Sequence, residues 1–448
     1  MDNRRDFIKK ATLTTAGLAI GAKAFSFTAK SYNNIIGAND RIHVAAIGLN
    51  GRGNSMVGTI AKQLNTEVSC VCDVDSRAMP KAIASILKAG QTTTPKSEKD
   101  CRKVMEDKSI DAIYIATPDH WHSPLTIMGC QAGKHVYVEK PLSHNPHEGE
   151  MAIAAARKYD RVVQMGAQRR SAPVLRQGIE ALHNGIIGRV YLAKTWYTNT
   201  RKSNFLKPGT VPSWLDYELW QGPAPRAPYQ DGLIHYNWHW FWNYGTGEAL
   251  NNGTHEVDVA RWGLGVDYPI RVTSVGGRYH YQDDWQTPDT QIITMDFPGR
   301  VSLMWENRSS NGRAIEGLDR GIIFYGEKGS LDTGGDSYKV YDNDGKLINN
   351  VKSLVVEAPI DARNTASVSL GMDSLHMADF LDAIRNHRKP NCDVELGHKS
   401  IVGMQLGNIA WRLGRDLKLD PKNGHIIGDP EAQKLWSRTY EKGWEPKI

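Results

Sequence analysis

From residue 42 onward, short apolar segments alternate with segments of helical periodicity, and this alternation limits the fold more than any other feature. Helices are expected from about Asn54 and Ser76, after Trp121 and after Pro146. Near-continuous apolar strands joined by helices indicate a parallel sheet that is buried on both faces. We therefore predict an α/β fold whose N-terminal domain is doubly wound. Its expected strands are IHVAAIG, EVSCVCD, IDAIYIATP, HVYVEKP and RVVQMG.

A glycine-rich turn joins the first strand to the first helix. Glycines there permit a tight turn and let N–H groups at the helix start approach a pyrophosphate. Asn50 stands where the usual fingerprint has its second glycine, and a turn that binds no phosphate is the alternative. Asp73 ends the second strand, where a carboxylate accepts from an adenosine 2′-hydroxyl and disfavours a 2′-phosphate. The turn therefore predicts a Rossmann domain that binds NAD through Gly48, Asn50, Gly51, Arg52, Gly53 and Asp73.

Two further motifs end strands of the same sheet. ATPDHWH spans residues 116–122, and EKP spans residues 139–141. The ligand crevice of an open α/β sheet lies outside the carboxyl ends of its strands, so both motifs should line it. The predicted cofactor-binding residues therefore also include Thr117, Pro118, His122, Glu139 and Lys140.

Five motifs occur in order over about residues 40–330: GLNGRG, ATPDHWH, EKP, VVQMGAQRR and GEALNNGTHEVDVARW. This combination resembles the glucose-fructose oxidoreductase / inositol dehydrogenase / MocA (Gfo/Idh/MocA) family. The resemblance implies a Rossmann domain followed by a C-terminal α/β domain with an open, mainly antiparallel sheet. In the family one face of that sheet carries the substrate site and the other often forms a subunit interface, so we expect a homo-oligomer.

The resemblance also implies roles for individual residues. The lysine of EKP, Lys140, should point at the nicotinamide and the substrate, and the bond before Pro141 is commonly cis in the family. Burial and the nearby nicotinamide charge should lower the pKa of Lys140, so that it takes the proton of the hydroxyl being oxidised. His255 is the second predicted catalytic residue. Family dehydrogenases often carry Asp four residues before it, whereas this chain has Asn251, which holds a sugar hydroxyl but accepts no proton.

Three residues of GEALNNGTHEVDVARW are spaced so that one continuous helix would place them on one face: Asn251, His255 and Asp258. Asp258 has two interpretations, orientation of His255 or a packing contact. Arg169, at the end of VVQMGAQRR, is expected to reach the cofactor or the substrate, and a solvated arginine is the alternative.

An insertion before this helix ends in HYNWHWFWNYGTG, residues 235–247, which is unusually rich in aromatic residues. Aromatic faces stack on sugar C–H surfaces, so a carbohydrate platform is one interpretation; a self-packed loop core or a subunit interface is the other. The predicted substrate-binding residues are Trp121, His239, Asn251, His255 and Asp258. Later segments alternate with turns as antiparallel strands do, and helices are expected near residues 371–387 and 398–414.

The first residues resemble a twin-arginine export signal. Arg4-Arg5 precedes a weakly apolar run, and Ala22-Lys23-Ala24 has a small-x-small cleavage pattern. The apolar run is too short to span a bilayer, so the mature protein is expected in the periplasm without a stable membrane span. We predict a signal peptide and linker over 1–30, a Rossmann domain over 40–168 and a substrate and oligomerisation domain over 169–430. Packing of the C-terminal helices back onto the first domain is compatible with these boundaries.

The composition argues against several classes of binding partner and structural support. A net charge of +6, with no basic block beyond the N-terminus, argues against nucleic acid. Five cysteines without framework spacing argue against a disulfide scaffold, and no Cys/His spacing predicts a metal site.

These observations predict an exported sugar or glycoside oxidoreductase that holds NAD tightly and oxidises a ring hydroxyl, with C3 as the first choice. Its substrate is a carbohydrate or glycoside, and an external electron or hydride acceptor is one route for returning the hydride. A second hypothesis follows from the resemblance to the family's NAD-dependent N-acetylgalactosaminidases, in which transient oxidation allows the aglycone to be eliminated before the hydride returns. A third is a sugar-binding protein without activity, supported only by Asn50 and Asn251.

Overall fold

The computed structural model describes residues 41–335, 337–352 and 370–448. The chain divides into Met1–Arg41 and Ile42–Ile448. Every helix and strand reported below belongs to the second unit. The predicted signal peptide lies outside the described residues, so export stays a prediction.

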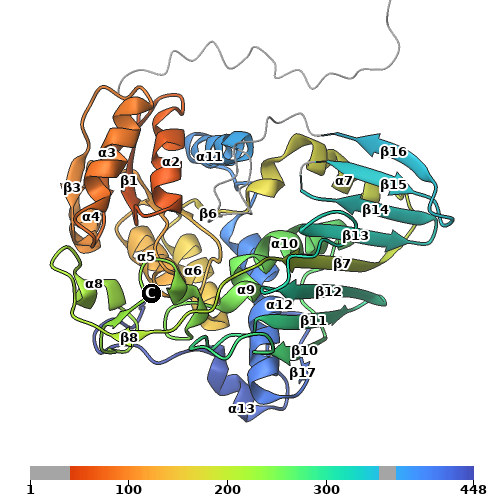
Figure 1. Ribbon diagram of the computed structural model, residues 1–448. Helices are drawn as coiled ribbons and strands as arrows, with labels where there is room; N and C mark the ends of the chain where they lie inside the picture. The colour runs from red at the N-terminus through yellow and green to blue at the C-terminus, as the bar shows by residue number, and fades with distance from the viewer. Residues whose placement is uncertain (1–40, 336, 353–369) are drawn as a thin grey trace, which may run out of the picture. The chain divides into compact units, whose positions relative to one another are not determined.

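The first domain contains a six-stranded sheet with the order β3-β2-β1-β4-β5-β6, in which all neighbouring strands are parallel (Figure 1). This is the predicted Rossmann-like sheet. Sequence pattern did not locate β3, because its three residues Lys96–Glu98 are polar and largely exposed. The strands are β1 (Ile42–Ile47), β2 (Thr66–Cys72), β3 (Lys96–Glu98), β4 (Ala112–Ile115), β5 (His135–Val138) and β6 (Val163–Met165).

Alternate residues of these strands enter two different cores. Ile47, Ile113 and Val138 belong to one hydrophobic cluster, whereas Val44 and Tyr114 belong to another. Both faces of the sheet are therefore buried, as the near-continuous apolar strands require. The covering helices are α2 (Arg52–Ala61), α3 (Ala78–Lys88), α4 (Cys101–Glu106), α5 (Asp119–Gln131) and α6 (Pro146–Lys158).

Helix α5 begins at Asp119, earlier than the expected start after Trp121. Pro118 precedes it in an extended conformation, and an acidic residue in the first turn suits the helix dipole. The polar residues of ATPDHWH therefore lie in the first turn of a helix at the carboxyl edge of the sheet.

The second domain contains a nine-stranded sheet with the order β16-β15-β14-β13-β7-β12-β11-β10-β17. Only β7 and β12 pair in parallel; the other neighbours are antiparallel, as the family resemblance implied. The strands are β7 (Val190–Thr198), β10 (Arg271–Gly277), β11 (Thr290–Phe297), β12 (Val301–Arg308), β13 (Arg320–Gly326), β14 (Gly329–Thr333), β15 (Tyr338–Tyr341), β16 (Leu347–Val351) and β17 (Leu417–Lys418).

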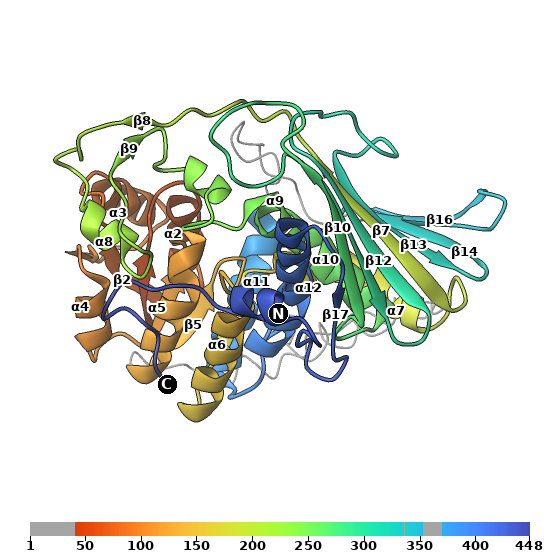
Figure 2. The same cartoon turned by 90° about the horizontal axis from the view of Figure 1, so that it is seen from below.

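Two C-terminal helices return to the first domain. Helix α12 (Val394–Leu413) packs against β10 on one side and α6 on the other (Figure 2). Helix α11 (Leu370–Arg385) packs against α2. Both domains therefore share these helices. The remaining elements are α7 (Pro173–His183), α8 (Tyr217–Gln221), α9 (Gly247–Asn251), α10 (Gly253–Leu264), α13 (Pro430–Gln433), β8 (Lys207–Pro208) and β9 (Gln230–Asp231).

The aromatic insertion forms its own hydrophobic cluster. Trp238, Trp240, Phe241 and Tyr244 are buried there, and the Trp240 ring stacks on Trp285 with centroids 4.1 Å apart. Most of the segment is thus a self-packed loop core, one of the two interpretations that the sequence allowed.

The five cysteines are free and buried. Within the described ranges, no helix is both long and apolar enough to cross a bilayer.

Candidate active site

Lys140 joins the two domains at the carboxyl edge of the parallel sheet. It follows β5 directly, and the Lys140–Pro141 bond is cis, as the resemblance implied. Its ammonium Nζ donates to the carbonyl oxygen of Asn251 at 2.6 Å and to Oδ1 of the same residue at 3.1 Å. Removal from water lowers the pKa of Lys140, which the carboxylates of Asp119, Glu139 and Glu248 partly oppose. The direction agrees with the predicted use of Lys140 as a base.

Glu139 and Arg52 bind one another. Arg52 Nε lies 2.9 Å from a carboxyl oxygen of Glu139, which also accepts from the Tyr114 hydroxyl at 3.0 Å. The other guanidinium nitrogens of Arg52 donate to Asp373 of α11 at 2.8 and 2.6 Å. Sequence reasoning predicted both residues as cofactor ligands. Instead, their charged groups fix the turn that carries Lys140 against α2 and α11.

The glycine-rich turn fits a pyrophosphate. Gly48 has φ +83°, and a Cβ there would lie 2.7 Å from the backbone of Ala116; a Cβ on Gly53 would lie 1.8 Å from the Gly48 oxygen. Gly51, at φ +48°, faces open space, and the N-terminus of α2 has no side-chain cap. Gly53 N–H donates to the Asn50 carbonyl at 3.2 Å, so an anion would be bound by the other N–H groups of this first turn. The buried Thr117 hydroxyl also has no hydrogen-bond partner among the described residues. The turn keeps this geometry although Asn50 stands where the usual fingerprint has its second glycine.

Asp73 lies beside the same turn. Its carboxylate accepts from the Leu49 N–H at 2.6 Å and the Asp75 N–H at 2.8 Å, one on each oxygen. Burial raises the pKa of Asp73, and these two hydrogen bonds oppose the rise. Each carboxyl oxygen keeps a further lone pair, so the residue fits the predicted contact with a ribose hydroxyl.

Asn251 and His255 belong to different helices, so the prediction of one continuous helix was wrong. Helix α9 ends at Asn251 and α10 starts at Gly253, with Asn252 between them at φ −111° and ψ −38°. The Asn252 side chain donates to Glu248 at 2.6 Å. An Asn-Gly pair allows this break, which sets the backbone carbonyl of Asn251 free to accept from Lys140.

His255 is a buried and neutral imidazole. Burial, together with the positive charges of Arg320, Lys140 and Arg169, holds its pKa well below the usual value. Its Nδ1 is buried and has no hydrogen-bond partner in the described parts of the chain. Among the described residues no hydrogen bond fixes this nitrogen, and the predicted catalytic role of His255 stays a prediction.

Asp258 does not orient His255. Both of its carboxyl oxygens accept from Arg170 Nε at 2.9 Å, and one also accepts from the Ser400 hydroxyl at 2.5 Å. The pair is almost fully buried. Of the two interpretations of Asp258, the packing contact describes the structure, and its predicted contact with substrate lacks support.

Arg169 also forms an internal ion pair. Its guanidinium lies 2.9 Å from Glu256, which is bound on the same oxygen by Arg320 at 2.8 Å. The three side chains are buried in the second domain. The buried position argues against a solvated arginine, the predicted contact with cofactor or substrate stays a prediction, and the positive charge of Arg169 lowers the pKa of His255.

Trp121 and His122 connect α5 to neighbouring segments of the fold. The Trp121 indole donates to the Trp220 carbonyl at 2.9 Å and packs edge-on against Trp444, so it is a core residue rather than a substrate ligand. His122 Nδ1 and Nε2 lie 2.6 and 2.8 Å from the carbonyl oxygens of Pro141 and Thr117. The imidazole thus ties the end of β4 to the EKP turn.

His239 lies close enough to Lys140 for the ammonium to lower its pKa, although burial is the larger cause. Its Nδ1 is 2.6 Å from the Tyr236 carbonyl oxygen and must carry the proton, which leaves Nε2 as an acceptor. The ring stacks on Trp238 with centroids 3.6 Å apart. His239 is thus a rigid neutral histidine, consistent with its predicted site role.

Sequence reasoning missed a polar network beside Asn251. Arg201 forms a buried ion pair with Glu248, and its other branch donates to the Tyr236 hydroxyl at 2.8 Å. Asn251 Nδ2 lies 3.5 Å from Glu248. Glu248 stands inside the GEALNN motif, but nothing in the sequence places Arg201, some 47 residues earlier, beside it. Tyr236 is 41% exposed, unlike its aromatic neighbours, so it can contact a substrate.

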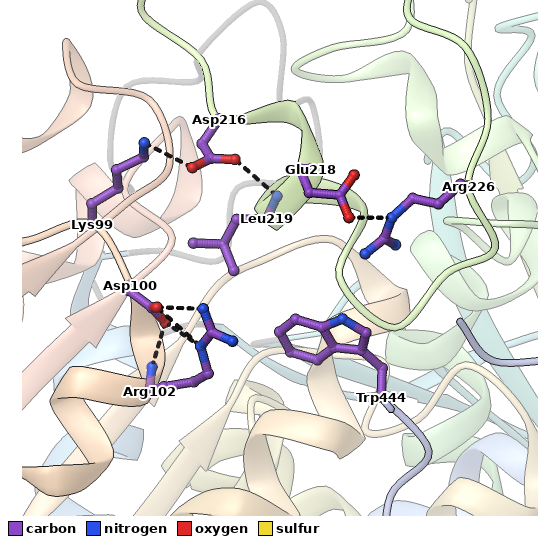
Figure 3. Close-up of a pocket in the computed structure, with 8 residues that line it drawn as sticks. All are labelled: Lys99, Asp100, Arg102, Asp216, Glu218, Leu219, Arg226 and Trp444. Carbon is purple, nitrogen blue, oxygen red and sulfur yellow. Dashed lines mark hydrogen bonds and ion pairs between the residues drawn. The ribbon is translucent and has the colours of Figure 1, made fainter. Parts of the chain in front are cut away.

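A cavity of about 450 Å³ is lined by none of the predicted site residues. It lies where α8, the loop before α4 and the C-terminal segment meet (Figure 3). Its charged residues form three ion pairs, and none of them is a predicted site residue. The pairs are Lys99–Asp216, Asp100–Arg102 and Glu218–Arg226. Within the described residues, no group of three His, Cys, Asp or Glu side chains could hold a metal ion.

The Rossmann sheet, its uncapped glycine turn and the partly buried lysine at its edge are typical of a nucleotide-dependent oxidoreductase. Residues 42–167 match the model of the oxidoreductase family, NAD-binding Rossmann fold, and residues 189–446 match that of the oxidoreductase family, C-terminal alpha/beta domain. The chain therefore belongs to the Gfo/Idh/MocA family of oxidoreductases. Its cofactor is NAD, as the sequence predicted.

Curated relatives match over part of the chain. The uncharacterized oxidoreductase YrbE of Bacillus subtilis (strain 168) is 26% identical over 235 residues, 52% of this chain and 57% of that protein. A glycosyl hydrolase family 109 protein of Saccharopolyspora erythraea is 24% identical over 253 residues, 51% and 55% of the two chains. An alpha-N-acetylgalactosaminidase of Shewanella oneidensis is 30% identical over 173 residues, 35% and 37%. The matches span about half the length of the first two relatives and less of the third.

Solved structures share the fold over most of the chain. Aldose-aldose oxidoreductase from Caulobacter crescentus superposes with a TM-score of 0.63 and 18% identity, over 85% of this chain and all of that one. Levoglucosan dehydrogenase in complex with NADH and levoglucosan gives 0.64 and 16%, over 84% and 99%. These likenesses establish the two-domain fold.

Proposed function

We propose that this protein is an NAD-dependent sugar or glycoside oxidoreductase that oxidises a ring hydroxyl, with C3 as the preferred position. The observation that carries the proposal is the partly buried Lys140, held on Asn251 at the edge of the dinucleotide crevice. Sugar substrates are supported by the names of the relatives, which include alpha-N-acetylgalactosaminidase and levoglucosan dehydrogenase. Tyr236, a residue that is 41% exposed, and the amide of Asn251 supply hydrogen bonds of the kind that sugars need.

The chain's own residues handle the proton. NAD, held by the glycine turn and Asp73, supplies the hydride acceptor. Lys140 is the base for the hydroxyl proton, because burial lowers its pKa against the opposing effect of the Asp119, Glu139 and Glu248 carboxylates. His255 stays neutral beside three cations, and its imidazole is the second group proposed to exchange a proton with the sugar. Asn251 orients Lys140 without competing for the proton.

Export by the twin-arginine route is part of this proposal. It rests on the Arg4-Arg5 pattern, the weakly apolar run after it and the Ala22-Lys23-Ala24 cleavage pattern, all outside the described residues. An extracytoplasmic compartment offers little free NAD, so the cofactor would be loaded before export and retained. The hydride must then return to the same sugar, to a second sugar or to an external acceptor.

A second candidate is an NAD-dependent glycosidase. It is favoured by the family 109 relatives and by His239, a second neutral histidine whose Nε2 accepts a proton near Lys140. In this reaction a keto group at C3 acidifies the C2–H, a base removes that proton, the C1–O bond to the aglycone breaks, and water adds at C1 as the C3 carbonyl is reduced again. It needs one base more than a dehydrogenase does.

One experiment separates these candidates. The mature protein is purified without added NAD, and aryl glycosides are supplied in deuterated water. An accumulating keto sugar with reduced nicotinamide identifies the dehydrogenase. Released aglycone without net reduction, together with deuterium at C2, identifies the glycosidase. Sugar binding without either product would overturn both and leave the binding protein.

A further inference from the structure

A segment of the second domain lies on the first domain beside Asp73. Residues 213–216 approach the loop that follows β2: Ser76 N–H donates to the Trp214 carbonyl, and Asp216 N–H donates to the Val74 carbonyl, both at 3.0 Å. Asp75 and Leu215 form an antiparallel bridge. The backbones of the two domains are thus paired at this point.

Side chains reinforce the pairing. The Arg77 guanidinium lies 3.3 Å from the centroid of the Trp214 ring, and Lys99 Nζ lies 2.7 Å from an Asp216 carboxyl oxygen. His235, from the aromatic insertion, lies 2.9 Å from Asp75. Trp214 is therefore held in one orientation by groups from both domains.

The paired segments enclose a cavity of about 110 Å³. Asp73, the residue predicted to bind the adenosine ribose, opens into it. The volume suits one end of a dinucleotide rather than the whole molecule, since sites that enclose a drug-sized ligand measure about 300–1,000 Å³. Its lining combines apolar and polar side chains: Asp73, Val74, Ser76, Met79, Lys99, Ser213, Trp214, Leu215 and Asp216.

We propose that this cavity receives the adenosine end of NAD and that residues 213–216 form a clasp over it. Trp214 and Met79 offer the apolar surface that a purine packs on, and Asp73 takes the ribose. NAD can then leave only after the backbone bridge, the Lys99–Asp216 ion pair and the Arg77–Trp214 contact have opened. The clasp rests on the retained cofactor of the proposed function and gives it a structural cause.

The test measures how fast bound NAD exchanges with isotope-labelled NAD in the purified protein. Asp216→Asn removes the ion pair with Lys99 but keeps the oxygen that caps Leu219 N–H in α8. Trp214→Ala removes the ring. Each variant should retain less NAD after gel filtration. Trp214→Ala should exchange it about tenfold faster, which corresponds to about 1.4 kcal/mol, and Asp216→Asn, whose ion pair is partly exposed, about threefold faster. The matched control is Glu218→Gln, which removes the neighbouring ion pair with Arg226 outside the cavity.

Different failures point to different errors. If the wild-type protein retains NAD and both variants exchange it at the wild-type rate, the clasp is overturned and the retained cofactor stands. If the wild-type protein itself exchanges NAD within seconds, both the clasp and the retained cofactor are overturned. Should Trp214→Ala fail to fold, Asp216→Asn decides alone, with thermal unfolding in excess NAD as the check on its fold.

Discussion

Lys140 donates hydrogen bonds to two oxygens of one residue, Asn251: the backbone carbonyl at 2.6 Å and Oδ1 at 3.1 Å. An aspartate at position 251 would place a negative charge against the ammonium and favour its protonated form. Asparagine gives the same orientation without that charge. Asn251 thus adds no charge to the carboxylates of Asp119, Glu139 and Glu248 that oppose the effect of burial, and the pKa of Lys140 is lowered.

Asn251→Asp should move the acid limb of the profile of kcat/KM against pH to higher pH. If neutral Lys140 is the base, kcat/KM rises with pH through its pKa, at a pH below the ordinary lysine value of 10.5. The added carboxylate raises that pKa, so the limb moves to higher pH and kcat/KM at pH 7 falls about tenfold. The control is Asn311→Asp, an exposed residue whose Oδ1 accepts a backbone N–H in either form. An unmoved limb would show that Lys140 does not set the profile.

Lys140→Met should keep NAD and lose turnover. Methionine fills most of the space of the lysine chain but accepts no proton, and losing a positioned base costs about 10²–10⁴ in rate. Bound nucleotide, measured after denaturation, should match the wild-type protein because the glycine turn and Asp73 are untouched. Lys158→Met, at the exposed end of α6, is the matched control. Nucleotide lost together with turnover would point instead to a binding role for Lys140.

Most of the fold followed from the sequence for a simple physical reason. Buried parallel strands must be apolar on both faces, so Ile113 and Tyr114, which enter opposite cores, leave a pattern that is easily recognised. Strand β3 was not predicted from the sequence, because its side chains are exposed at the sheet edge. The start of α5 was misplaced because Pro118 already stands at the N-cap and Asp119 already suits a first turn.

The site was only partly predictable. Motif position identified Lys140, Asn251 and His255, because strand ends and family motifs are local features. The partners of charged groups are not local: Arg201 meets Glu248, and Arg52 meets Asp373 across 321 residues. Arg169 and Asp258 were read as ligands for the same reason, since their buried ion partners leave no mark in the motif that contains them.

Asp258→Asn should destabilise the protein rather than impair the chemistry. It leaves the Arg170 charge buried without its carboxylate, and breaking such a pair typically costs about 3–5 kcal/mol. Urea unfolding measures the loss. Asp267→Asn is the control, because this carboxylate is 59% exposed and pairs with Arg261 and Lys399, so the loss should stay below about 1 kcal/mol. If Asp258 oriented His255, the folded fraction of the variant would also lose turnover, which we do not expect.

Tyr236→Phe should impair sugar binding, whereas Trp240→Ala should destabilise the fold. The Tyr236 ring faces the site, and the Trp240 ring fills the loop core. Trp240 is fully buried and stacks on Trp285, so its loss should cost about 3–5 kcal/mol of unfolding free energy. Tyr236→Phe removes only a hydroxyl that accepts from Arg201 and leaves the ring in place. Its stability should change by about 1 kcal/mol or less, while KM for the sugar rises about tenfold. Thermal unfolding and steady-state kinetics on both variants check the assignment; an unchanged KM in Tyr236→Phe would remove Tyr236 from the substrate site.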